Sequence, residues 1–162
     1  MSQDQAPQTA TKALNYYETR AVALALRVME SALTTRDVLL DTPSVVRNYL
    51  SLLLFREDVE VFYVLLLDSR HRLIEARPMF RGTLNQTAVY PREIVRAALL
   101  SNAAAVILAH NHPSGVPQPS IADRTLTQAI RTALATVDVA TLDHVVVAGS
   151  KSLSFADHGW MN

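Results

Sequence analysis

Two almost wholly apolar runs restrict the fold of this chain more than any other feature of its 162 residues. Residues 59–67 (VEVFYVLLL) and 104–109 (AAVILA) are each short enough for a strand. A strand that has no alternating polar face is covered on both sides in folded proteins. The chain is therefore predicted to build a sheet with helices packed on both of its faces.

Helix and strand patterns alternate around these runs. Helix starts are expected at Thr42–Pro43, at Pro91 and at Ser120, since each offers an N-capping residue or a proline suited to the first turn. Further strands are expected over about 72–79 and 139–148, and the residues after 148 as a short tail. Strands in pairs separated by helices predict an α/β (α+β) fold with a single mixed β-sheet flanked by helices.

The chain is predicted to hold one active domain, over residues 42–162. Residues 1–11 are polar and aperiodic, which predicts a disordered tail. Residues 12–41 are interpreted as an amphipathic helix and linker, because Val22, Leu26, Met29 and Leu33 recur at helical spacing. Such a helix is expected to dock on the domain or on a partner, including a second copy of the chain.

Composition narrows the function classes. The chain has no cysteine, so a transition metal would need histidine and carboxylate ligands. Fifteen basic residues balance fifteen acidic ones, so no overall positive field favours DNA or an anionic membrane. No apolar run approaches the ~20 residues that span a bilayer, and the N-terminus lacks a signal-peptide pattern. We expect a cytoplasmic protein without a membrane partner.

Residues 109–123 (AHNHPSGVPQPSIAD) carry most of the chemistry. His110 and His112 are two apart at the end of a strand, where alternate side chains point to the same side. Asp123 falls at the third position of a helix capped by Ser120. Two imidazoles and one carboxylate leave one tetrahedral position of Zn²⁺ open for water, which is typical of catalytic zinc sites.

Each of these residues also has an ordinary structural interpretation. Two histidines at a strand end often form a polar rim, Asp123 alone would favour a helix start through the helix dipole, and Ser120 alone would be an N-cap. Taken together, however, they form the pattern H-x-H-P, six residues, S, two residues, D. This combination favours a metal site.

The pattern resembles the JAMM signature of the JAB1/MPN metallopeptidases, and specifically their RadC-like branch, which is bacterial. The branch's local form, HNHPSG, then PS and D, is present at residues 110–115, 119–120 and 123, and the resemblance extends over about 42–159. Supporting matches are RGTLN at 81–85, PREI at 91–94, LDH at 142–144 and SFA at 154–156. Tyr90, Val116 and Asp157-His158 depart from the family pattern and leave the three ligands intact.

The resemblance implies a JAB1/MPN (cytidine-deaminase-like) sandwich that holds one Zn²⁺ per chain at His110, His112 and Asp123. It implies hydrolysis of a peptide or isopeptide substrate, with Ser120 donating a hydrogen bond to the tetrahedral intermediate. The family's general base is a glutamate on an early strand, and Glu60 is the best match to it. Glu57 and Glu93 are its rivals.

Residues beside the ligands are expected to support them, since metal-bound histidines generally need a hydrogen-bond partner for the second ring nitrogen. Asn111, Ser114 and Asp143 are the candidates, although the sequence favours an ordinary loop or turn role for each of them. His144 is expected to be a packed or rim histidine and not a fourth ligand. His71 and His158 are expected to be exposed.

Two other functions remain open. The family's association with DNA repair and mobile elements implies a DNA-processing role, which neither the charge nor a DNA-binding motif supports. The helix-hairpin-helix region of long RadC-like proteins is not expected in this chain. The other alternative is a non-catalytic interaction module of MPN type that docks through its N-terminal helix.

Overall fold

The computed structural model describes residues 18–25, 38–82 and 89–161. The predicted disordered tail over residues 1–11 lies outside this part of the chain. So does most of the amphipathic segment predicted over 12–41, of which residues 18–25 are helical. Within the described ranges, no helix has both the length and the apolar character needed to cross a membrane.

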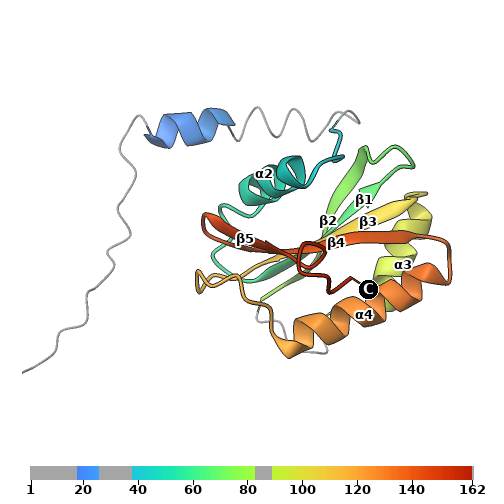
Figure 1. Cartoon of the computed structure of the whole chain (residues 1–162). Helices are drawn as coiled ribbons and strands as arrows, with labels where there is room; N and C mark the ends of the chain where they lie inside the picture. Colours follow the sequence, from blue (N-terminus) through green and yellow to red (C-terminus); the bar gives the residue numbers. More distant parts are fainter. Residues whose placement is uncertain (1–17, 26–37, 83–88, 162) are drawn as a thin grey trace, which may run out of the picture.

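Five strands form one sheet in the order β2-β1-β3-β4-β5 (Figure 1). Their bounds are β1 Val61–Leu67, β2 Leu73–Arg81, β3 Ala105–Asn111, β4 Ala140–Ala148 and β5 Lys151–Ser154. Strands β3 and β4 are parallel, and every other neighbouring pair is antiparallel. The predicted α+β fold with a single mixed sheet is confirmed.

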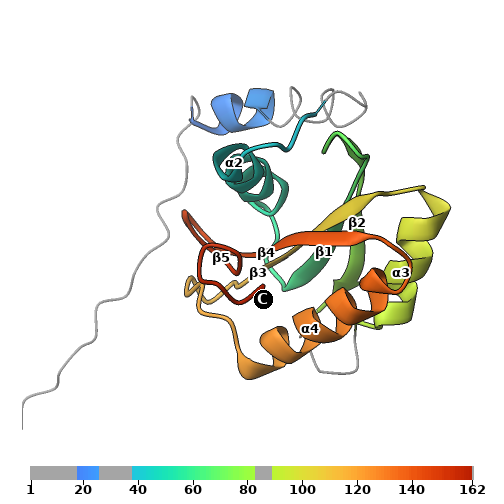
Figure 2. The ribbon, with the colours of Figure 1, turned by 45° about the vertical axis from the view of Figure 1, so that its right-hand side comes forward.

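Helices cover both faces of this sheet. Helix α2 (Pro43–Leu53) lies on one face, whereas α3 (Pro91–Leu100) and α4 (Ile121–Ala135) lie on the other (Figure 2). Parallel strands need a long crossover connection, and α4 supplies it between β3 and β4. All three helices begin at the residues predicted from their caps and prolines.

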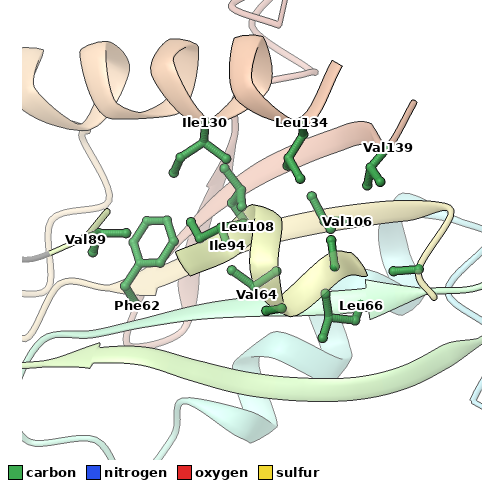
Figure 3. Packing of buried hydrophobic residues seen from close by; sticks show 13 residues of the cluster. Phe62, Val64, Leu66, Val89, Ile94, Val106, Leu108, Ile130, Leu134 and Val139 are labelled. Carbon is green, nitrogen blue, oxygen red and sulfur yellow. The ribbon is translucent and has the colours of Figure 1, made fainter. Parts of the chain in front are cut away.

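The two-residue period of β1 divides the core between the two layers. Phe62, Val64 and Leu66 point towards α3 and α4, where Ile130 and Leu134 of α4 pack above them (Figure 3). The alternate residues of β1 join Val46 and Leu50 of α2 on the opposite face. The strand is thus apolar throughout because both of its faces are buried.

The end of the chain differs from the sequence prediction. Residues after 148 were expected to form a tail, but Lys151–Ser154 form β5, which pairs with β4. The two strands are joined by Gly149 and Ser150, and Gly149 has a positive φ of 61°. Two-residue hairpin loops favour this conformation because it matches the twist of the strands. The tail prediction is therefore wrong for these four residues.

The chain also joins the sheet earlier than Thr42. Leu39 forms an isolated antiparallel bridge with Arg72, and Leu40 is only 2% exposed. The backbone N–H of Leu73 donates to the Val38 carbonyl at 2.8 Å. Residues 38–40 thus pack against the sheet.

Candidate metal centre

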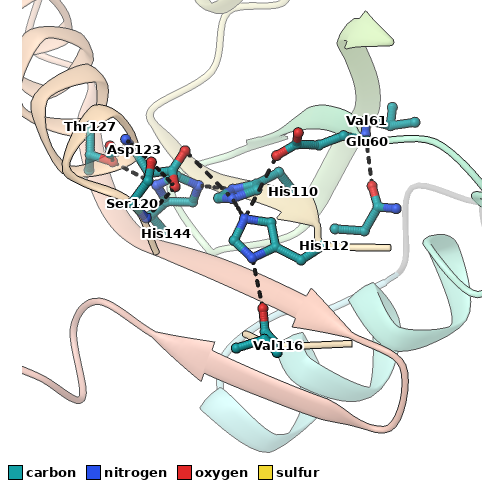
Figure 4. A network of polar contacts seen from close by, with 10 residues as sticks. Glu60, Val61, His110, His112, Val116, Ser120, Asp123, Thr127 and His144 are labelled. Carbon is teal, nitrogen blue, oxygen red and sulfur yellow. Dashed lines mark hydrogen bonds and ion pairs between the residues drawn. The ribbon is translucent and has the colours of Figure 1, made fainter. Parts of the chain in front are cut away.

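His110 and His112 lie at the carboxyl end of β3, where the sequence predicts them. The side chain of His110 is fully buried, and that of His112 is 17% exposed. Their Nε2 atoms lie 2.9 Å apart (Figure 4). One histidine is therefore inside the core and the other opens to solvent, with a ring nitrogen of each directed at the same point.

A carboxylate reaches each histidine from a different element. Strand β1 runs antiparallel to β3 with Phe62 opposite His110, so Glu60 comes opposite His112. Its Oε1 lies 3.7 Å from His112 Nε2. On the other side, Asp123 Oδ1 from the first turn of α4 lies 3.7 Å from His110 Nε2.

The described residues contain one group of three whose ligand atoms all lie within 4.8 Å of one another, and it consists of Glu60, His110 and His112. Asp123 is outside this group as the side chains stand, although it approaches His110. Glu60, selected from the sequence as the candidate base, is therefore placed as close to the histidine pair as the predicted ligand Asp123. The rivals of Glu60 are engaged elsewhere, Glu57 with Arg81 and Glu93 with Arg92 and Arg96.

The second ring nitrogen of each histidine has a partner that fixes the tautomer. His112 Nδ1 lies 2.8 Å from the Val116 carbonyl, which can only accept, so Nδ1 carries the proton. His110 Nδ1 lies 2.8 Å from His144 Nε2, and His144 Nδ1 lies 2.6 Å from Thr127 Oγ1. Which group donates in each of these hydrogen bonds follows from the Thr127 hydroxyl.

The Thr127 hydroxyl donates its one proton to the Asp123 carbonyl at 2.6 Å. It must therefore accept from His144 Nδ1–H, which leaves His144 Nε2 free to accept from His110 Nδ1–H. Burial, reinforced by the charges of the other histidines, holds the pKa of His144 well below its usual value. Burial likewise lowers the pKa of His110 to about 4, so both rings are neutral at pH 7.

When both rings are neutral, as zinc binding requires, these tautomers leave the Nε2 lone pairs of His110 and His112 available. Two nitrogen lone pairs that face each other at 2.9 Å repel unless a cation lies between or beside them. A zinc ion binds imidazole nitrogen at about 2.0–2.1 Å and takes carboxylate oxygens as further ligands. The donor set of two neutral imidazoles and two flanking carboxylates therefore fits a zinc ion.

The start of α4 holds Asp123 in place. Asp123 Oδ2 accepts from both the backbone N–H and the hydroxyl of Ser120, each at 2.7 Å, while the Ser120 Oγ accepts from the Asp123 N–H at 3.1 Å. This is the reciprocal capping box predicted from the spacing. Because Oδ2 is used in the cap, Oδ1 is the oxygen turned towards His110.

The three predicted supporting residues make their hydrogen bonds with groups other than the imidazoles. Asn111 bonds the backbone at the entry to β1, and Ser114 Oγ accepts from the Val116 N–H at 3.5 Å. Asp143 accepts from the Ser154 hydroxyl and from two backbone N–H groups at β4 and the following turn. The imidazole partners in the structure are instead His144 and the Val116 carbonyl.

Sequence reasoning missed the Thr127–His144 chain, for which a partial signal exists. Thr127 is four residues after Asp123, on the same side of α4. His144 pairs with Leu108, two residues before His110 in the neighbouring strand, and is therefore on the same sheet face. It is packed and fully buried, as expected. His71 and His158 are exposed, also as expected.

A groove of about 770 Å³ opens beside the histidine pair. The metal end of the groove is formed by Glu60, His112, Ser120 and Asp123. The remainder is lined mainly by apolar groups of α4, of the loop after β3 and of the residues that begin α3. The candidate centre is thus accessible from solvent along a channel large enough for an organic ligand.

Together these features define an α+β domain with a cluster of histidine and carboxylate side chains that could hold a metal ion at one end of a mixed sheet. The sequence matches the RadC-like JAB domain family over residues 40–160, and the chain belongs to that family. The resemblance to the RadC-like branch of the JAB1/MPN proteins is confirmed.

The curated relatives of the chain carry names that state no activity. A UPF0758 protein of Leptothrix cholodnii is 58% identical over 136 residues, which cover 84% of this chain and 61% of the relative. UPF0758 protein Mpe_A2695 of Methylibium petroleiphilum is 48% identical over 162 residues, which cover 98% of this chain and 73% of the relative. UPF0758 protein HEAR2468 of Herminiimonas arsenicoxydans is 59% identical over 122 residues, covering 75% and 54%. The chain thus spans between about half and three quarters of these proteins.

Proposed function

We propose that this domain is a zinc-dependent hydrolase that cleaves an amide bond of a peptide or isopeptide substrate. The observation that carries the proposal is the convergence of the Nε2 atoms of His110 and His112, 2.9 Å apart, with Glu60 and Asp123 each 3.7 Å from one of them. The open groove beside them gives a substrate access to this point. His110, His112 and Asp123 would hold one zinc ion per chain.

Zinc bound there would polarise a substrate carbonyl and make a water molecule acidic near neutral pH. Glu60, whose side chain is 20% exposed, stands at the solvent side of the pair and would take the proton from that water. It would then return the proton to the leaving amine. Ser120 lines the same end of the groove, and its hydroxyl would turn from Asp123 to donate to the developing oxyanion.

The position of Glu60 favours this proposal over a non-catalytic interaction module. A general base must reach the attacking water directly or through one other water. Glu60 Oε1 is 3.7 Å from His112 Nε2, which supports a role as base for a water bound beside that nitrogen. The DNA-processing alternative receives no comparable support, since the described lining residues of the groove include no lysine or arginine.

Metal analysis of the purified protein, combined with a peptidase assay, tests the proposal. We expect close to one zinc per chain, lost when His110 and His112 are both replaced by alanine. Glu60→Gln should keep the zinc but lower the hydrolysis of a mixed fluorogenic peptide library by 10²-fold or more. Glu93→Gln serves as the control, because Glu93 pairs with surface arginines. Zinc-free protein, purified without chelator, would count decisively against the proposal.

A further inference from the structure

One side of the groove beyond the metal centre is a stripe of small and apolar residues on α4. Ala122, Thr125, Leu126 and Ala129 recur at steps of three, one and three, so they lie on one side of the helix. The seven helical steps from Ala122 to Ala129 extend about 10 Å along the axis. The stripe starts directly beside Asp123 and therefore leads away from the metal centre.

The space in this part of the groove depends on the small side chains of the two alanines at the ends of the stripe, Ala122 and Ala129. Ala129 is exposed, and a larger side chain there would project into the space that the groove now occupies. The first turn of α4 is fixed by the Ser120–Asp123 capping box, so the stripe has a defined position relative to the metal ligands. The depth of the groove is therefore set by side-chain size on a rigid element.

The other side of the groove is formed by Val89, Tyr90 and Pro91 before α3, and by Val116 in the loop after β3. Val116 is 57% exposed, although its backbone carbonyl is held by the His112 ring. The turn that accepts a hydrogen bond from His112 thus also presents an apolar side chain to the groove. This side chain would contact whatever occupies the groove next to His112.

Charge restricts that occupant further. Among the described lining residues, the titratable acidic and histidine groups are Glu60, His112 and Asp123, all at the metal end. Two nearby cations stack on aromatic rings and do not line the groove: Arg92 lies over the Tyr90 ring at 5.2 Å, and Arg124 lies over the Trp160 ring at 3.8 Å. A phosphate backbone would need basic contacts along its path. An uncharged apolar group needs none.

We infer that this groove is a specificity pocket for an uncharged, apolar side chain of the substrate, next to the bond that is cleaved at the metal centre. The inference rests on the proposed function, because it places the reacting bond at His110 and His112. Ala122 and Ala129 leave room for a side chain of the size of leucine or phenylalanine. Leu126, Val89 and Val116 supply the apolar surface that it would contact.

Amino-acid hydroxamates provide the test, since the hydroxamate group binds zinc and the side chain reports on the groove. Affinities of leucine, phenylalanine, aspartate and lysine hydroxamates would be measured by calorimetry on the zinc-loaded full chain. We expect the leucine and phenylalanine compounds to bind at least about tenfold more tightly than the charged ones. Equal affinities, or a preference for a charged side chain, would overturn the inference while leaving the metal centre intact.

Two variants of α4 locate the effect. Ala129→Phe should fill the groove and remove the preference for leucine and phenylalanine, with zinc content unchanged. Ala135→Phe is the matched control, because Ala135 is an exposed alanine on the same helix that does not line the groove. A preference that survives in Ala129→Phe would refute the assignment. If no hydroxamate binds and no zinc is retained, the proposed function fails together with the inference, and this result differs from uniform binding.

Discussion

At the residue scale, the proposed metal ligand His110 is oriented by hydrogen-bond partners that are not themselves proposed ligands. His110 offers its Nε2 lone pair because Thr127 and His144 oblige its Nδ1 to carry the proton. The Thr127 hydroxyl also donates a hydrogen bond to the backbone carbonyl of Asp123. The same series of hydrogen bonds therefore connects two of the proposed ligands, His110 and Asp123. A single hydroxyl thus controls both a tautomer and the backbone of a neighbouring ligand.

Replacement of Thr127 tests this chain. In Thr127→Val the side chain keeps its shape but cannot accept from His144, so the buried His144 Nδ1–H loses its partner and the His110 tautomer is no longer fixed. We expect a 10- to 100-fold loss of zinc affinity, the usual effect of removing a partner of a ligand histidine. Thr127→Ser keeps the hydroxyl and should bind zinc nearly as the parent does. Competition with a coloured chelator measures both, and indistinguishable affinities for Val and Ser would disprove the role.

Tyr49 on α2 gives a prediction about alkaline pH. Its hydroxyl is buried without a hydrogen-bond partner among the described residues. Burial, and then the nearby Tyr63, raise its pKa well above 10. The unfolded chain releases this proton near pH 10 whereas the folded chain retains it, so stability falls as the pH rises above about 10.

Tyr49→Phe should therefore lose less stability between pH 7 and pH 10.5 than the parent does. At pH 7 it should be as stable or slightly more stable, because an unpaired buried hydroxyl costs on the order of 1 kcal/mol. Urea unfolding at the two pH values measures the difference. Identical pH dependence in the two proteins would show that Tyr49 does not contribute.

At the element scale, local signals were sufficient for most of the fold. Pro43, Pro91 and Ser120 mark their helix starts because the requirements of a first turn depend on nearby residues alone. Strand β5 was missed because four residues hold too little pattern, although Gly149-Ser150 is a legible hairpin loop. The hairpin turn could be seen in the sequence, but the residues after it contain no apolar run long enough to predict a strand.

Some residues of the candidate site could likewise be predicted from local sequence, whereas others depend on the pairing of distant strands. His110, His112, Ser120 and Asp123 lie within fourteen residues, so their spacing along one strand, loop and helix start indicates that they meet. His144 comes 34 residues after His110 and reaches it only through the parallel pairing of β3 and β4. No local periodicity encodes that register. The position of Glu60 likewise depends on the antiparallel pairing of β1 with β3.

Asn111, the last residue of β3, fixes the entry of β1 and hence Glu60. Its Oδ1 accepts from the Val61 N–H at 2.7 Å, and its Nδ2 donates to the Val59 carbonyl at 2.8 Å. Asn111→Ala should lower stability by about 1–3 kcal/mol, because these buried backbone groups lose their partners. It should also reduce hydrolysis more than zinc content, since Glu60 is loosened and the ligands are not. Equal losses of zinc and of rate would contradict this division of roles.

Ser120 caps the start of α4, and its proposed role as an oxyanion donor can be tested separately from the cap. As an N-cap, it is worth about 1 kcal/mol of stability, which Ser120→Ala should remove. As an oxyanion donor, it should also support turnover, so the same change should lower kcat about 10²- to 10³-fold. Ser120→Thr retains both the cap and the hydroxyl and is the control. A variant Ser120→Ala that is less stable but turns over at the parental rate would leave only the capping role.

At the scale of the whole molecule, the proposed ligands connect parts of the fold that are distant in sequence. His110 is near the carboxyl end of β3, Asp123 is in the first turn of α4, and the proposed base Glu60 directly precedes β1. The centre therefore lies where one end of the sheet meets a helix of the covering layer (Figure 4). An ion bound there would bridge the sheet and α4. Metal binding to the folded chain alone would then add directly to its stability.

Zinc should therefore raise the melting temperature of the domain. At a free zinc concentration of 100 times Kd, linkage gives about 2.7 kcal/mol of added stability. For a chain of this size, each kcal/mol moves Tm by roughly 2–4 °C, so we expect a rise of about 5–10 °C over chelator-treated protein. Thermal unfolding followed by circular dichroism measures the shift. His112→Gln removes a partly exposed ligand without opening the core, and its Tm should respond little to zinc. An equal rise in this variant would mean that zinc stabilises the fold from a site other than the histidine pair.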